Sequence, residues 1–256
     1  MKHISGIWNF DLATAGVVLL VVAFTLCFAS AKKWLPSLIA LLLLCIGLIS
    51  PLHLLAANYF SAHMTVHVLL LLCVGPALVF SLRQYSLRHF FNFLKHHPLL
   101  CWSAGVGVMW LWHVPVVFNH TMVAMHSGNS LMASGEYVSL IVAGMLFSAP
   151  LIHADPANRI DALSGVAYLF TACFACSLLG LLVTFAPPGT YHQPVMHAAS
   201  AQVQSLVSRI HLSKTADQQT AGLIMWVPCC LLYVSGALYL LKKYFTEKEL
   251  TSTETP

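Results

Sequence analysis

The segment Leu163–Ala186, LSGVAYLFTACFACSLLGLLVTFA, decides the fold class, because it is almost entirely apolar and contains no charged residue. A helix that crosses a bilayer needs roughly 20 mostly apolar residues, and this segment is long enough. Each such run is expected to be a helix, since an open sheet in lipid leaves backbone groups without hydrogen-bond partners. Six further apolar runs lie at about Leu12–Ala31, Leu35–Leu55, Met64–Leu82, Leu99–Phe118, Tyr137–Ile152 and Ala221–Leu241.

The composition of the whole chain points the same way. Of 256 residues, 59% are hydrophobic and only 8% are charged, and the mean hydropathy is +0.80. A soluble domain carries about a quarter charged residues, so an ordinary soluble enzyme is excluded. The few basic residues form no stripe, which excludes a nucleic-acid partner. We predict an all-α polytopic membrane protein, a single transmembrane domain over residues 1–256 with seven transmembrane helices and membrane lipid as its surroundings.

The distribution of Lys and Arg predicts the orientation of this bundle. Cytoplasmic loops of membrane proteins carry an excess of basic residues. With seven spans, one side holds nine of the twelve Lys and Arg residues, including the Lys32-Lys33 pair and the C-terminal lysines, and the other side holds three. The N-terminus is therefore expected outside and the C-terminus in the cytoplasm.

Two segments depart from the simple pattern of long runs and short joints. The fifth run, Tyr137–Ile152, is expected to be the shortest span. The outer loop 187–220 follows Pro187-Pro188-Gly189, which ends the sixth run. Within that loop, apolar residues at helical spacing predict a short amphipathic helix on the outer membrane surface. These residues are Ala199, Val203, Leu206, Val207 and Ile210.

Histidines gather on the expected outer side, where ten of the fourteen fall. His63 and His67 enter the third run from outside, and residues four apart share one face of a helix, so both imidazoles can bind one metal ion. His113 lies near the outer end of the fourth run and His53 near the outer end of the second. Polar side chains at membrane depth are costly and usually functional. The sequence therefore predicts a metal site at the outer face.

Soft donors lie close to these histidines. His63-Met64, Met125-His126 and Met196-His197 are neighbouring pairs, and Met122 adds another thioether. Imidazole with thioether suits copper, especially Cu(I), although methionine is also frequent in membrane helices without any such role. The eight cysteines lie within or at the ends of apolar runs, so we expect small buried apolar residues and no disulfide framework.

Asp217 precedes the seventh run and admits two interpretations. A carboxylate there can cap its own helix by accepting backbone N–H groups. It can also orient a metal-bound histidine from behind. Gly222, within the seventh run, is expected to allow close packing of the seventh helix against a neighbour.

Three motifs then occur in order: His63-Met64-x-x-His67-x-Leu69-Leu70, Trp112-His113-x-Pro115, and Asp217-Gln218-Gln219-x-Ala221-Gly222-x-Ile224-Met225-Trp226. The chain thus resembles the CtaG-type cytochrome c oxidase assembly factors, polytopic proteins of bacterial plasma membranes, from the second run through the seventh. The family often has a Glu-His pair at the start of the fifth helix, whereas here Glu136 is followed by Tyr137. A ligand from that helix is therefore in question, and His120 or His126 are the candidate substitutes.

The resemblance implies a multi-pass protein of the bacterial inner membrane that helps to mature a haem–copper oxidase and has no catalytic turnover. Its expected partners are cytochrome c oxidase subunits and a periplasmic copper chaperone, and its expected cargo is copper. We predict His63 and His67 as ligands, His113 as a third, His53 at similar depth, and Asp217 as the residue that orients one of them.

Other classes of protein use similar residues. A transmembrane zinc hydrolase could hold Zn²⁺ with three histidines and use Asp217 or Glu136 as a base, and this alternative stays open. A haem-b carrier needs histidine pairs near both faces of the membrane. The inner-side histidines lie at helix ends or in joints, so a haem on that side has no ligands. A di-iron centre would have to combine His63 and His67 with His96 and His97. The charge distribution places these two pairs on opposite faces of the membrane, so one centre cannot use both.

Overall fold

The computed structural model describes residues 8–82, 88–126, 130–152, 159–191 and 212–253, and in this part of the chain every extended regular element is a helix, as expected. One isolated β-bridge joins Ala29 to Leu82. The elements are α1 (Leu12–Phe28), η1 (Ala31–Lys33), α2 (Trp34–Leu48), α3 (Pro51–Ala56), α4 (Phe60–Leu69), η2 (Leu70–Val74), α5 (Gly75–Ser81), α6 (Arg88–His96), α7 (Pro98–His113), α8 (Pro115–His126), α9 (Ser130–Ile152), α10 (Ala162–Phe185) and α12 (Lys214–Thr253).

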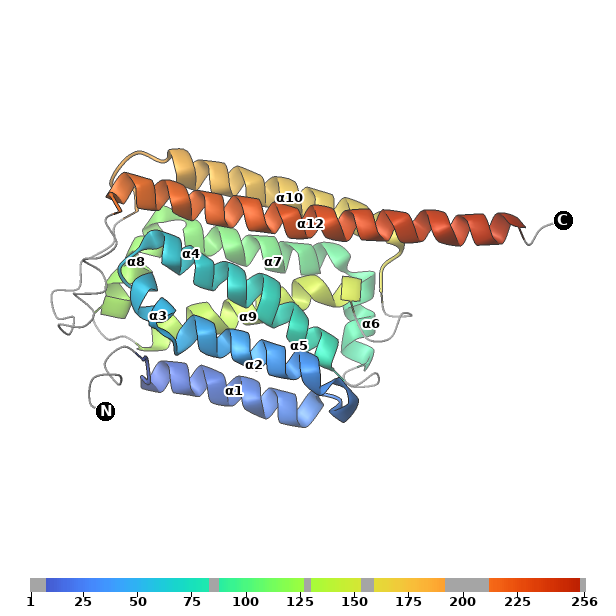
Figure 1. Cartoon of the computed structure of the whole chain (residues 1–256), viewed down its shortest axis with the longest axis horizontal. Coiled ribbons are helices and arrows are strands. Elements are labelled where there is room, and N and C mark those ends of the chain that lie inside the picture. Colours follow the sequence, from blue (N-terminus) through green and yellow to red (C-terminus); the bar gives the residue numbers. More distant parts are fainter. Residues whose placement is uncertain (1–7, 83–87, 127–129, 153–158, 192–211, 254–256) are drawn as a thin grey trace.

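The long helices lie side by side, and the chain runs back and forth between two ends of the bundle (Figure 1). We call one of them the polar end: it contains α3, the beginnings of α4, α9 and α12, and the end of α7, at the left of Figure 1. The opposite end contains α6, the end of α5 and the beginning of α10. The C-terminal part of α12 projects beyond the other helices at that opposite end.

Four helices are long and apolar enough to cross a membrane: 60–81, comprising α4, η2 and α5, together with α9, α10 and α12. The bent pair α7–α8 brings the number to five if it forms one span, among the residues described. The expected runs at Leu12–Ala31 and Leu35–Leu55 contain the shorter apolar helices α1 and α2. The structure therefore establishes an all-helical bundle with four or five candidate spans.

Two expected runs are broken by proline. The second run is divided between α2 and α3, where the Ser50 hydroxyl accepts the Leu52 amide and Pro51 occupies the first helical position. The fourth run bends by 70° between α7 and α8. Val114, which precedes Pro115, adopts an extended conformation because the proline ring disfavours a helical residue before it. Neither of these two runs therefore forms one continuous helix.

The fifth run is longer than its apolar residues suggested. The helix α9 has 23 residues and begins at Ser130, seven residues before the expected start. Its first two turns include Glu136, which is only 1% exposed. The segment before Tyr137 contains polar residues, so its sequence did not indicate a membrane helix. Only the structure shows that neighbouring helices bury some of these residues. The amphipathic helix expected from Ala199 to Ile210 lies outside the described residues.

Close helix contacts depend on glycine at two crossings. A β-carbon at Gly222 of α12 would lie 2.7 Å from the Gly180 carbonyl oxygen of α10, so these backbones touch directly. A β-carbon at Gly144 of α9 would lie 2.2 Å from the Leu71 carbonyl oxygen of η2. Small residues let helices approach closely where lipid provides no hydrophobic force between them. The close packing expected at Gly222 is confirmed.

Candidate metal centre

The first two members of the centre come from one face of α4. His63 and His67 are one turn apart, and their ring centroids are separated by 4.4 Å. Both side chains are buried, at 3% and 0% exposure. The π-helical turn η2 follows immediately, before Pro76, and such turns are frequent at functional sites.

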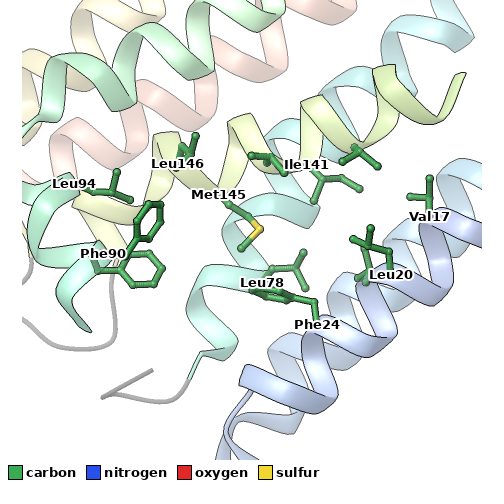
Figure 2. A pocket seen from close by; sticks show the side chains of 13 residues that line it. Val17, Leu20, Phe24, Leu78, Phe90, Leu94, Ile141, Met145 and Leu146 are labelled. Atoms are coloured by element: carbon green, nitrogen blue, oxygen red, sulfur yellow. The ribbon is translucent and has the colours of Figure 1, made fainter. Parts of the chain in front are cut away.

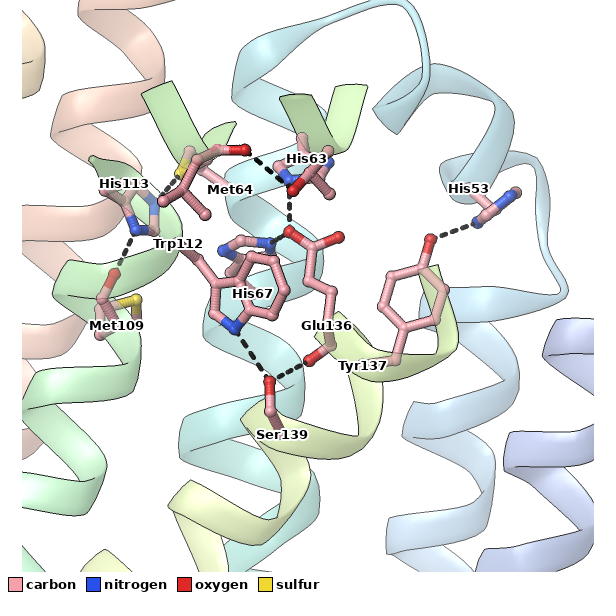
Figure 3. Close-up of polar contacts among 12 residues, drawn as sticks. His53, His63, Met64, His67, Met109, Trp112, His113, Glu136, Tyr137 and Ser139 are labelled. Carbon is pink, nitrogen blue, oxygen red and sulfur yellow. Dashed lines mark hydrogen bonds and ion pairs between the residues drawn. The ribbon is translucent and has the colours of Figure 1, made fainter. Parts of the chain in front are cut away.

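The third member is Glu136 of α9, which faces both imidazoles (Figure 3). Its Oε1 atom lies 2.9 Å from His67 Nε2 and 3.3 Å from His63 Nε2. One donor atom from each of the three residues lies within 4.8 Å of the other two. Three metal-ligating side chains from two helices therefore converge on one buried point.

Two polar atoms of this group, His67 Nδ1 and Glu136 Oε2, have no hydrogen-bond partner among the described residues, and His63 Nε2 has only its 3.3 Å ion-pair contact with Glu136 Oε1. Leaving a buried polar atom unsatisfied costs about 1–3 kcal/mol. A cation among the three side chains would use this unsatisfied capacity, and imidazole with carboxylate is a common ligand set for transition metals. The residues present therefore fit a metal ion.

His113 extends the group from the end of α7. It is 2% exposed, and its ring lies 5.2 Å from the His67 ring at 90°. Its Nδ1 atom contacts the Met109 carbonyl oxygen at 2.5 Å, and its Nε2 atom lies 2.7 Å from Met64 Sδ. The structure thus places an imidazole and a thioether together beside the three converging residues, rather than adding His113 to them directly.

His53 lies apart from the three converging residues, although the sequence placed it at a similar depth. It belongs to α3, is partly exposed, and its Nδ1 atom lies 3.3 Å from the Tyr137 hydroxyl (Figure 3). Tyr137 stands where the family often has histidine, and it follows Glu136 directly in the chain. The structure therefore connects His53 to the centre through α9 and does not bring it to Glu136.

A hydrogen-bond chain positions the turn of α9 that carries Glu136. The Trp112 indole donates to the Ser139 hydroxyl at 2.8 Å, and that hydroxyl donates to the Glu136 carbonyl oxygen at 2.8 Å (Figure 3). The second sequence motif therefore supports the centre twice, because Trp112 holds α9 while its neighbour His113 packs beside His67.

Asp217 holds the beginning of α4 rather than a histidine. Its carboxylate accepts the backbone N–H groups of Phe60 at 2.7 Å and Ser61 at 3.0 Å, and the Ser61 hydroxyl at 2.5 Å. The first-turn amides of a helix lack partners within the helix, so this carboxylate completes α4 from a distant part of the chain. Asp217 does not cap its own helix, because the Ser213 hydroxyl accepts the Ala216 amide there.

Gln218, the next residue of α12, contacts the end of α10. Its side-chain amide donates to the carbonyl oxygens of Val183 and Ala186, which end α10, at 3.1 and 2.7 Å. Adjacent residues of α12 thus fasten the start of α4 and the end of α10. The third sequence motif therefore has a positioning role that the sequence did not reveal.

Aromatic rings cover the centre at the polar end. Phe118 of α8 meets the His63 ring edge-on at 5.6 Å, and it packs against Phe60 and Tyr191. The Tyr191 hydroxyl donates to the His113 carbonyl oxygen at 3.1 Å. This arrangement keeps the imidazoles out of contact with bulk solvent.

The remaining candidates lie away from the centre or outside the described side chains. His120 is exposed, and its Nδ1 atom contacts the Val116 carbonyl oxygen of its own helix, so it does not take the place of a fifth-run ligand. Met122 is buried in the main hydrophobic core. The side chains of Met125 and His126, and Met196 altogether, lie outside what the structure describes.

Glu136 is the residue that sequence reasoning missed as a member of the metal group. The expected fifth run began one residue later, at Tyr137, so this carboxylate fell outside the predicted span. Its position inside a membrane helix, where an acidic residue is costly, becomes evident only because α9 begins at Ser130.

The sequence matches one known protein family. The sequence model of the cytochrome c oxidase caa3 assembly factor family (CtaG) matches residues 29–247, which include every residue of the centre. No curated protein and no solved structure matches the chain. The match covers most of the chain, and the protein belongs to the family of cytochrome c oxidase caa3 assembly factors.

Proposed function

We propose that this assembly factor supports copper insertion into a haem–copper oxidase by holding a copper ion at His63, His67 and Glu136. The observation that carries the proposal is the convergence of three buried donor atoms within 4.8 Å. Burying these polar groups in a membrane protein is costly, and a bound cation offsets that cost.

The donor chemistry supports copper as the cargo. Two imidazoles and a carboxylate suit Cu(II), whereas a thioether favours Cu(I). The His113–Met64 pair lies next to the three converging residues and offers the softer donors. The two adjoining donor sets therefore provide ligands for either oxidation state within one buried region.

For delivery, the polar end has to face the outside of the bacterial inner membrane. We infer that all seven expected runs cross the membrane, with the N-terminus outside and the C-terminus in the cytoplasm. The basic residues Lys33, Lys95 and Lys242 lie on elements that reach or project from the opposite end of the bundle (Figure 1). This arrangement agrees with the excess of positive charge in cytoplasmic segments.

A cavity of about 590 Å³ between α7, α8 and α10 lies beside the centre, and none of the three converging residues lines it. His113 and Tyr191 form part of its wall. We propose that a periplasmic copper chaperone supplies the ion from the outer side and that an oxidase subunit receives it there.

The test is the copper content of the purified full-length protein after copper loading. We expect the unaltered protein to bind about one copper ion per chain more than the His63→Ala/His67→Ala variant does, and the control His120→Ala, which removes an exposed histidine, to bind as much as the unaltered protein. In cells, the double variant is expected to lower the copper content and activity of the oxidase. Unchanged oxidase copper and activity in that variant would refute the proposal.

One observation favours a second function, a membrane zinc hydrolase. Two histidines and one glutamate are also a ligand set of catalytic zinc sites. Against it, Glu136 faces both imidazoles and Asp217 caps α4, so both carboxylates considered as bases are otherwise engaged. Zinc in place of copper, together with ester or amide hydrolysis that His63→Ala/His67→Ala abolishes, would establish this alternative.

A further inference from the structure

Four thiols meet where α10 packs against α12, away from the histidine centre. Cys173 and Cys176 lie on one face of α10, and Cys229 and Cys230 are adjacent on α12. All four are free cysteines, and Cys173, Cys176 and Cys229 pack among apolar and aromatic side chains.

Two of the thiols face each other across the helix interface. Cys173 Sγ lies 3.0 Å from Cys230 Sγ. The Cys176 thiol also donates to the Met225 carbonyl oxygen at 3.2 Å. Cysteines used only as small apolar residues have no need to meet sulfur to sulfur across a helix interface.

We propose that this thiol cluster is a second copper site, at which Cys173 and Cys230 bind Cu(I) as thiolates. Thiolate sulfur is the soft donor that selects Cu(I) over harder ions. Binding needs no oxidant, because Cu⁺ replaces two thiol protons, which leave as 2 H⁺, and the product is an anionic dithiolate complex. The choice of copper over other thiophilic ions rests on the proposed function.

A hydroxyl group is in place to stabilise the bound form. The Ser177 hydroxyl donates to the Cys173 carbonyl oxygen at 2.8 Å and lies 3.0 Å from Cys230 Sγ. When Cys230 loses its proton, this hydroxyl can turn from the carbonyl to the sulfur. A hydrogen bond to an ionised acceptor is about twice as strong as one between neutral groups, which offsets part of the cost of a charge in this apolar region.

The experiment titrates Cu(I) into the full-length protein, reduced and without oxygen, against a competing chelator. We expect the His63→Ala/His67→Ala variant to retain one Cu(I), and the Cys173→Ser/Cys230→Ser variant to lose that ion, with at least a 100-fold weaker affinity. The matched control is Cys27→Ser/Cys45→Ser, which removes two free cysteines on α1 and α2 and is expected to bind as the unaltered protein does.

X-ray absorption at the copper edge of the His63→Ala/His67→Ala protein provides a measurement that does not depend on folding of the cysteine variant. Sulfur neighbours alone are expected. Nitrogen and oxygen neighbours alone, or no Cu(I) uptake once the histidines are removed, would overturn the thiolate site while leaving the histidine proposal standing. A Cys173–Cys230 disulfide in protein isolated without oxidant, with no Cu(I) uptake after its reduction, would also overturn it.

Discussion

Apolar helices enclose both the polar end of the bundle and the cavity between α1, α5, α6 and α9, but the side chains that these helices bury differ. They are polar at the polar end and apolar around the cavity. At the polar end, buried imidazole and carboxylate groups face one another across 3 to 5 Å. The other region is a cavity of about 220 Å³ lined only by apolar side chains, including Leu20, Leu78 and Met145 (Figure 2).

The difference separates what lipid can provide from what it cannot. An apolar cavity that faces the bilayer can be filled by acyl chains, which are as apolar as leucine. Buried charged and polar groups have no such substitute and must be satisfied by protein or by a ligand. Substitutions at the polar end are therefore expected to have larger effects than substitutions around the cavity.

The largest effect is expected from Glu136→Ala, which removes the carboxylate that faces both imidazoles. Copper affinity is expected to fall by on the order of 100-fold or more, measured by competition with a chelator. Ser148→Ala is the control, because Ser148 is a buried polar residue of the same helix that bonds only its own turn. Equal affinities in the two variants would show that α9 contributes no ligand.

His113→Ala is expected to have a smaller effect, because His113 adjoins the three converging residues without belonging to them. Roughly a tenfold loss of copper affinity is expected, with Cu(I) affected more than Cu(II) because the contact with Met64 is lost. His120→Ala, on the neighbouring helix, is the reference. A complete loss of copper would instead place His113 among the principal ligands.

Asp217→Ala tests the support of α4 from α12. Loss of a helix cap costs about 0.5–2 kcal/mol, and this one also fixes the helix that carries both histidines. We expect a lower free energy of unfolding and a several-fold loss of copper affinity. Asp161→Ala removes the cap of α10, where Asp161 accepts the Ser164 amide, and is expected to leave copper binding unchanged. Similar copper affinities in both variants would refute the positioning role of Asp217.

The smallest effect is expected from Leu20→Phe, which adds volume beside the apolar cavity. The apolar cavity beside Leu20 has room for the ring, so the change in the free energy of unfolding is expected to stay within about 0.5 kcal/mol. Copper binding is expected to be unaltered. A marked loss of copper here would show that the cavity and the polar end are coupled, contrary to the comparison above.

The sequence predicted the parts of this molecule that depend on local pattern. The spacing of His63 and His67 was enough to place both rings on one face, and the apolar runs identified the helical class. Pro115 predicts a kink in the fourth run, but a run of apolar residues does not give the size of the bend, which is 70°. Local sequence patterns therefore predicted which face of α4 carries the histidines, but not the direction that the chain takes after a bend.

Relations between distant segments could not be predicted. Asp217 and Phe60 are 157 residues apart, and no periodicity in either segment indicates that one caps the other. The pairing of Glu136 with the histidines likewise depends on how α9 lies against α4, which a hydrophobic pattern does not specify. Glu136 stands one residue before the expected fifth run, so the cost of an acidic residue inside an apolar helix did not point to it from the sequence.

The cap on α4 also sets an order of events during synthesis. The histidines of α4 leave the ribosome long before Asp217, which lies on the last helix of the described chain. Chains are made from the N-terminus, so the first turn of α4 has to wait for α12 before its amides are satisfied by this carboxylate. A chain interrupted before residue 217 therefore carries both histidines but lacks the carboxylate that caps their helix, so the histidine centre is complete only after translation has passed that residue.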